Sequence, residues 1–170
     1  NFITKDFISF NGMVNNFGFY FKNTNKVGKK VSTLKNSPQV NFMNIINFES
    51  KYPLIKIDDN YYNSLIPKLS FRINPTDMKN YKNEDRKINT TNIFSINRLG
   101  LDDTFEEGRS LTLGLDYKKE KLNDINRFFE LKIASVLRDT DEKFIPSSST
   151  LGQKSSNIFG TMQSNFSKFF

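Results

Sequence analysis

The residues of this chain that could do chemistry are carboxylates in adjacent pairs, Asp102 with Asp103 and Glu106 with Glu107. Such oxygen ligands bind divalent cations, and two neighbouring carboxylates can act as acid and base. Both pairs lie in a polar stretch without regular apolar spacing, and adjacent carboxylates in a loop are usually solvated. We therefore expect both pairs to be hydrated, and we predict no catalytic residue, no metal site and no cofactor.

Other residue types on which enzymes depend are missing. The 170 residues include no His and no Cys, which excludes disulfides, thiolate nucleophiles, histidine general bases and the usual zinc ligands. The formal net charge of +7 suggests a nucleic-acid partner, but the Lys and Arg residues are spread over the whole chain and no nucleic-acid-binding motif is present. We expect neither an enzyme nor a nucleic-acid-binding protein.

A second set of charged residues alternates with apolar ones. Lys68 and Arg72 stand between apolar residues in one segment, and Glu130 and Lys132 do so in another. Two charges on the inner face of one strand are costly in a dry core but ordinary in the watery lumen of a membrane barrel. The residues that we predict to face such a lumen are Lys68, Arg72, Asp116, Glu130, Lys132 and Arg138.

The clearest alternating segment covers residues 110–117 and reads S-L-T-L-G-L-D-Y. A period of two predicts a β-strand. Its small and polar face (Ser110, Thr112, Gly114, Asp116) has nothing that could build a core, so we expect that face to contact water. The residues that we predict to face lipid, here and in the segment that follows, are Leu111, Leu113, Leu115, Phe129, Leu131 and Ile133.

Similar alternation recurs along the chain and predicts roughly seven antiparallel strands. We expect strands over 2–10, 13–22, 39–48, 61–73, 110–117, 128–138 and 157–170. A turn at Asn11-Gly12 and shorter connections at 49–60 and 118–126 alternate with long polar loops at 23–38, 74–107 and 139–156. Pro67 cannot donate to a sheet ladder, so in a soluble sheet it would require an edge or a bulge.

These strands suit a membrane barrel better than a membrane helix. No apolar run approaches the ~20 residues of a spanning helix, whereas about 9–11 residues suffice for a barrel strand, and only a closed barrel satisfies every backbone group in lipid. The mean hydropathy of -0.55 is compatible, because half of each barrel strand faces water. We predict an all-β fold, an antiparallel segment of a large transmembrane β-barrel that does not close on its own.

Two stretches carry recognisable motifs. One reads N-I-F at 92–94 and N-R-L-G-L-D at 97–102, and it leads into L-T-L-G-L at 111–115; the other reads L-I-P-K-L-S-F-R at 65–72 and is followed by Pro75. Both resemble signature patterns of LptD, the lipopolysaccharide-assembly protein of the outer membrane. The residues that carry the resemblance are Pro67, Pro75, Asn97, Arg98, Gly100 and Asp102.

The resemblance implies a position and a role. Residues 1–170 would be an internal fragment of an LptD-like C-terminal barrel domain, without the N-terminal jellyroll domain. The function implied is transport of lipopolysaccharide into the outer leaflet of the Gram-negative outer membrane, without bond chemistry. The partners implied are lipopolysaccharide, an LptE-like plug lipoprotein, an LptA-like periplasmic bridge that binds the missing jellyroll domain, and outer-membrane lipids.

Two other classes remain open on the sequence alone. A different outer-membrane barrel, such as a porin or a receptor, would share the alternation but not the two motifs. A soluble periplasmic β-sandwich binding module would place the charged faces outward and pack the apolar faces of two sheets together. If the chain is a barrel, its long loops are extracellular and its short turns periplasmic, so we expect the Asn97-Arg98 loop on the cell-surface side.

Overall fold

The computed structural model describes residues 2–28 and 39–165. The strands are β1 (Phe2–Ile3), β2 (Phe7–Ile8), β3 (Val14–Lys26), β4 (Gln39–Lys51), β5 (Leu54–Ile57), β6 (Tyr61–Asn74), β7 (Gly108–Lys121), β8 (Asp124–Arg138) and β9 (Phe159–Asn165). One short 3-10 helix, η1 (Ser147–Ser149), lies between β8 and β9. Within the two described ranges, no helix is long and apolar enough to cross a membrane.

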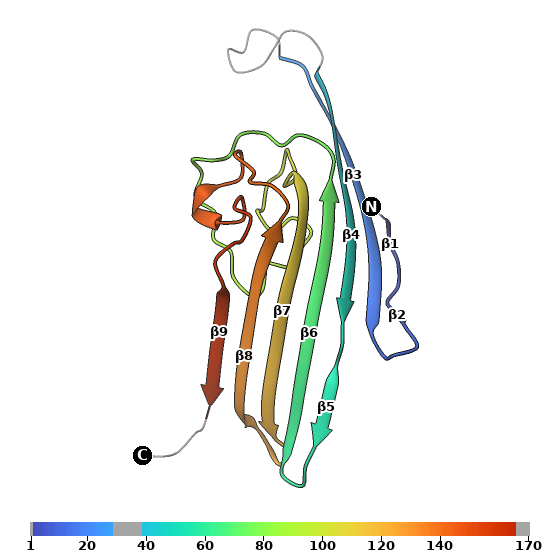
Figure 1. Cartoon of the computed structure of the whole chain (residues 1–170), viewed down its shortest axis with the longest axis vertical. Coiled ribbons are helices and arrows are strands. Elements are labelled where there is room, and N and C mark those ends of the chain that lie inside the picture. Colours follow the sequence, from blue (N-terminus) through green and yellow to red (C-terminus); the bar gives the residue numbers. More distant parts are fainter. Residues whose placement is uncertain (1, 29–38, 166–170) are drawn as a thin grey trace.

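All nine strands form one antiparallel sheet, in the order β1-β3-β4-β6-β7-β8-β9 (Figure 1). The short strands β1 and β2 both pair with β3, and β4 and β5 both pair with β6, so the sheet has seven strand positions. Among the described residues the two edge positions do not pair with each other. The prediction of an all-β, antiparallel sheet of roughly seven strands that does not close is therefore confirmed.

Several strands are longer than the sequence predicts. The stretch 118–126 is not a charged turn, because β7 continues to Lys121 and β8 begins at Asp124, which leaves a two-residue connection. The stretch 49–60 contains the end of β4 and all of β5, and the predicted strand over 2–10 is split into β1 and β2. Residues 118–121 are all charged, so the end of β7 shows no alternation of polar and apolar residues and resembles a turn in the sequence. The predicted end of the last strand, with Phe169 and Phe170, lies outside the described residues.

Pro67 occupies the middle of a central strand. It pairs with Leu115 of β7 on one side, and on the other side its carbonyl accepts a hydrogen bond of 3.0 Å from the Tyr52 backbone N–H. The N and O atoms of one strand residue point to the same neighbour, so the donor that Pro67 lacks would point at the interruption between β4 and β5. The sheet thus places its irregularity opposite the proline, as a proline in a sheet requires.

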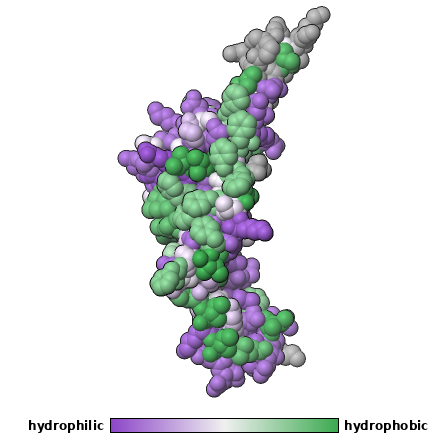
Figure 2. All heavy atoms as spheres, turned by 90° about the vertical axis from the view of Figure 1, so that its right-hand side faces the viewer, coloured by the Kyte–Doolittle hydropathy of each residue, from purple (hydrophilic) through white to green (hydrophobic). Residues whose placement is uncertain are grey.

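The two faces of the sheet differ in polarity. Strand pairing aligns one apolar row across five strands on the outer face, and this row consists of Phe17, Phe48, Phe71, Leu111 and Leu137. Large side chains on this face stay open, with Phe17 47%, Phe42 55% and Phe71 40% exposed. Figure 2, which faces the edge that carries β1 and β3, shows hydrophobic side chains along much of the length of the molecule.

The inner face is covered at one end by residues 75–107 and 139–158, which we call the loop module. The two segments follow β6 and β8, which end at the same end of the sheet, and they fold back over β7, β8 and β9 (Figure 1). The buried core lies between the loop module and the sheet, and consists of Met78, Ile93, Leu99, Leu101, Ala134, Val136, Ile145 and Leu151. Apart from Asn74, which ends β6, the long loops predicted at 74–107 and 139–156 contain no strand, as expected, but they are packed segments.

Candidate functional site

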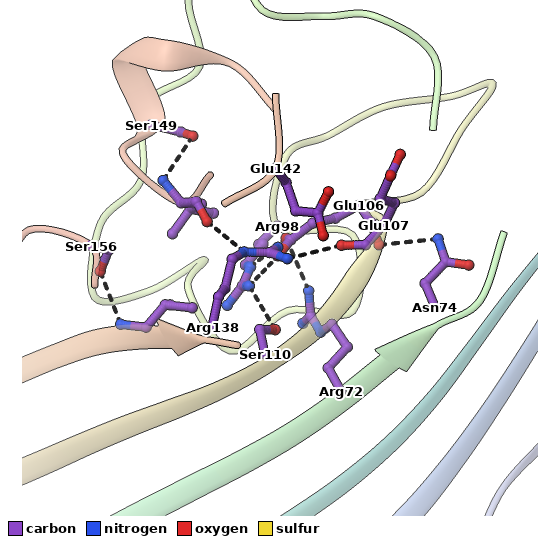
Figure 3. A network of polar contacts seen from close by, with 12 residues as sticks. Arg72, Asn74, Arg98, Glu106, Glu107, Ser110, Arg138, Glu142, Ser149 and Ser156 are labelled. Atoms are coloured by element: carbon purple, nitrogen blue, oxygen red, sulfur yellow. Dashed lines mark hydrogen bonds and ion pairs between the residues drawn. The ribbon is translucent and has the colours of Figure 1, made fainter. Parts of the chain in front are cut away.

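Three arginines and one glutamate meet where the loop module joins the sheet (Figure 3). Arg72 comes from β6 and Arg138 from β8, while Arg98 and Glu106 come from the loop module. At most 4% of any of these four side chains is exposed. A buried ion is tolerated only when its charge and its hydrogen-bonding groups are matched, so the contacts among these four side chains decide whether the module stays in place.

Glu106 is the centre of this cluster, which we call the arginine–glutamate cluster. Arg98 binds it with two nitrogens: Nε donates to Oε2 at 2.6 Å, and Nη2 donates to Oε1. Arg138 Nη2 also donates to Oε1, and Arg72 Nη1 lies 3.5 Å from Oε2. A two-point contact between guanidinium and carboxylate is among the strongest and most directional polar contacts in proteins. The single carboxylate thereby connects the loop module to two strands.

The polar face of β7 supports Arg98. Arg98 Nη1 donates to Thr112 Oγ1 at 2.9 Å, and Nη2 donates to Ser110 Oγ at 3.1 Å. Ser110 and Thr112 are 3% and 1% exposed, so the prediction that this face contacts water is wrong for both. Small residues with hydroxyl groups are needed here because a long side chain lies flat on the strand and must be hydrogen-bonded.

A tight turn aims Arg98 at the sheet. The Asn97 side chain accepts a hydrogen bond from Leu101 N–H at 3.0 Å and donates one to the Leu101 carbonyl at 2.8 Å. Gly100 has a φ of +63°, a conformation that glycine adopts readily, and its N–H donates to the Asn97 carbonyl at 3.0 Å. The motif residues at 97, 98 and 100 therefore have a joint structural role. Asp102 is exposed, and its carbonyl accepts a bond from Lys22 Nζ.

Four other residues that we predicted to face a lumen lie nearer the short-turn end of the inner face. Lys68 forms an ion pair with Asp116, and Lys132 lies 2.9 Å from Glu130. Their side chains are 22–30% exposed. The six predicted charges thus share one face but divide into two groups, because Arg72 and Arg138 lie beneath the loop module.

The Phe94 ring lies on the inner face between these two groups of charges. A Cβ atom on Gly114 would lie 2.6 Å from the Phe94 ring, so β7 needs a residue without a side chain where the ring packs. Lys68 Nζ lies 5.4 Å from the centre of the same ring, within the range of a cation–π contact. The motif residues Phe94 and Gly114 are therefore in direct contact.

The acid pairs do not behave as predicted. Burial alone would raise the pKa of Glu106, but the charges of Arg98 and Arg138, the hydrogen bond from Arg98 and the charge of Arg72 together lower it to about 2. Glu107 accepts a bond of 2.7 Å from the Met78 N–H. The prediction that both pairs are merely hydrated is wrong for Glu106 and Glu107, and also for Asp103, which is bonded by Lys79 and Tyr81. Nothing in the sequence distinguishes a glutamate that contacts three arginines from a solvated one.

Polar contacts away from the cluster also fix the loop module. The Tyr81 hydroxyl donates to Asp103, and this bond, burial and the Asp103 charge raise the pKa of Tyr81 to about 12. Burial and the nearby Glu107 charge raise the pKa of Glu142. In the part of the chain that the structure describes, no group of three or more acidic side chains could hold a metal ion.

The residues predicted to face lipid all lie on the outer face, opposite the charged groups. Leu111, Leu113 and Leu115 of β7 pair with alternate residues of β8, and these residues of both strands share the outer face. Pro75 is exposed just after β6.

No protein-family model, curated protein or solved structure matches the chain. The described residues form a polar inner face that the loop module covers at one end, and an apolar outer face.

Proposed function

We propose that this chain is part of a transmembrane β-barrel in the outer membrane of a Gram-negative bacterium, and that this barrel transports lipopolysaccharide into the outer leaflet. The observation that carries the proposal is the uncovered apolar outer face. Soluble proteins rarely expose contiguous apolar patches larger than a few hundred Å². The row from Phe17 to Leu137 crosses five neighbouring strands, and lipid is the solvent that suits it.

The open edges support the same proposal. The outer edges of β1, β2 and β9 carry backbone groups that need partners. In lipid such groups must be paired within the protein, so further strands of the same barrel would pair with them. Strands of 13 to 15 residues, as in β3, β4, β6, β7 and β8, exceed the about 9–11 residues that a tilted strand needs to cross a bilayer.

The transport role rests on the resemblance to LptD together with the inner face. Lys68 and Lys132 lie on that face with their acidic partners, and such a polar surface suits the phosphorylated sugar head of lipopolysaccharide while the acyl chains stay in lipid. We propose lipopolysaccharide, an LptE-like plug lipoprotein, an LptA-like periplasmic bridge acting through a jellyroll domain, and outer-membrane lipids as partners. No cofactor and no bond chemistry are part of this mechanism.

A cellular experiment tests the proposal. The full-length protein is located by membrane fractionation, and its migration in SDS gels is compared before and after heating. Lipopolysaccharide at the cell surface is then measured in cells depleted of the protein. We expect outer-membrane location, slower migration after heating and loss of newly made lipopolysaccharide from the surface. Outer-membrane location with unchanged surface lipopolysaccharide would favour a porin or receptor, and a soluble periplasmic protein would favour the β-sandwich.

A further inference from the structure

A groove lies on the outer face at the short-turn end of the sheet. Its volume is about 420 Å³, and it is lined by Tyr61, Tyr117, Lys119, Lys121, Arg127, Phe128 and Phe129. This volume is within the range of ligand-binding pockets in proteins. The groove is far from the arginine–glutamate cluster, which lies on the inner face at the long-loop end, so it requires an explanation of its own.

Aromatic rings form the walls of this groove. The Tyr117 and Phe129 ring centres lie 6.1 Å apart, and Lys119 Nζ lies 4.3 Å from the centre of the Tyr61 ring. Tyr61 pairs with Lys121 across β6 and β7. A ring of tyrosine and phenylalanine beside lysine is typical of the boundary between the apolar part of a membrane and its headgroups.

The positive charge of the groove is poorly neutralised. Arg127 Nε lies 3.1 Å from Asp124, but among the residues that the structure describes neither Lys119 nor Lys121 forms an ion pair. The adjacent carboxylate, Glu120, pairs with Lys118 on the inner face. By contrast, the cation at the long-loop end of the outer face is neutralised, because Arg109 Nη2 lies 2.5 Å from an Asp139 carboxylate oxygen.

We propose that this groove binds the phosphate headgroup of an anionic glycerophospholipid from the leaflet at the short-turn end. Lys119 and Lys121 contact the phosphate oxygens, and the glycerol and the start of an acyl chain lie against Tyr117 and Phe129. Above the groove the outer face continues with apolar side chains, which suits the rest of that acyl chain. The inference rests on the proposed function only in requiring that the outer face contacts lipid.

Lysine acetylation in vesicles tests this inference. The full-length protein is reconstituted in vesicles of phosphatidylcholine alone or of phosphatidylcholine with phosphatidylglycerol, and the modification rate of each lysine is read by mass spectrometry. We expect phosphatidylglycerol to slow modification of Lys119 and Lys121 about fivefold, the factor that corresponds to one favourable lysine contact with anionic lipid. Lys118, at the same height on the inner face, is the internal control and keeps its rate.

A double variant gives a second readout. K119Q/K121Q lowers the affinity for phosphatidylglycerol about thirtyfold if the two contacts add, whereas K118Q leaves the affinity unchanged; heat-dependent migration in SDS verifies that each variant folds. Equal rates in both kinds of vesicle would overturn the inference without touching the transport proposal. Equal protection by inorganic phosphate in detergent would reveal a site for free anions and would also overturn it. A protein that does not enter vesicles at all would overturn both proposals.

Discussion

At the scale of single residues, Glu106 has the greatest influence on the loop module. It is the only carboxylate that contacts Arg98 and Arg138 at hydrogen-bond distance among the described residues, and all three side chains are buried. Removing one partner of a buried ion pair leaves an uncompensated charge. Three guanidinium groups without their shared carboxylate would repel one another at short range, so the module should detach before the strands separate.

Glu106→Gln should therefore release the loop module. We expect the free energy of unfolding to fall by about 3–5 kcal/mol, the usual cost of breaking a buried ion pair. Protease cleavage within 75–107 should become fast in the folded full-length protein. Glu107→Gln is the matched control, because an amide oxygen still accepts the Met78 N–H bond, and this variant should keep the protection of the wild type. Equal protection of both variants would show that the cluster does not hold the module.

The pKa of Glu106 sets an acid limit for the same contact. Its value of about 2 in the folded chain lies below the ordinary 4.5, so ionised Glu106 stabilises the fold fully above about pH 4.5. That stabilisation is lost as the pH falls towards 2. Protease protection with an acid-active enzyme should decrease over this range in the wild type, and this part of the pH dependence should be absent in Glu106→Gln. Identical profiles would contradict the assignment.

At the scale of elements, the loop module packs on β7 where Gly114, which has no side chain, leaves room for the Phe94 ring. Gly114→Ala would place its Cβ against the Phe94 ring, 2.6 Å away, and overpacking of this kind costs about 1–3 kcal/mol. Gly160→Ala in β9 is the control, since the nearest atoms to its Cβ would lie 3.9 Å away. Unfolding by urea in detergent measures both. The addition of Phe94→Ala should remove most of the penalty at Gly114, and additive effects would argue against direct contact.

The elements also show what the sequence could and could not reveal. Period-two alternation located β6, β7 and β8 and divided their residues correctly between two faces, because the pattern is local. It underestimated strand length where Lys118 to Lys121 continue β7, since charged strand ends resemble turns. The packing of the loop module was missed, because Ile93, Leu99 and Leu101 have no regular spacing and become a core only against Ala134 and Val136 of β8.

At the scale of the whole molecule, the sheet combines three environments. The loop module buries the inner face at one end, and paired charges cover it nearer the other end. The outer face exposes large apolar side chains such as Phe17, Phe42 and Phe71, and ends in the lysine-lined groove at the short-turn end. A soluble sheet would need a second layer over the outer face, and the described residues form one sheet. Any function proposed for this chain must therefore account for a polar inner face and an apolar outer face on the same sheet.

The direct test is whether the outer face contacts lipid. The chain has no cysteine, so single cysteines can be introduced at residues 130, 131, 132 and 133 of β8 in the full-length protein and labelled with a fluorophore. Nitroxide lipids in reconstituted vesicles should quench the label at Leu131 and Ile133, and should leave it bright at Glu130 and Lys132. Equal quenching at all four positions, or quenching at none, would contradict a transmembrane barrel and with it the transport function proposed for this protein.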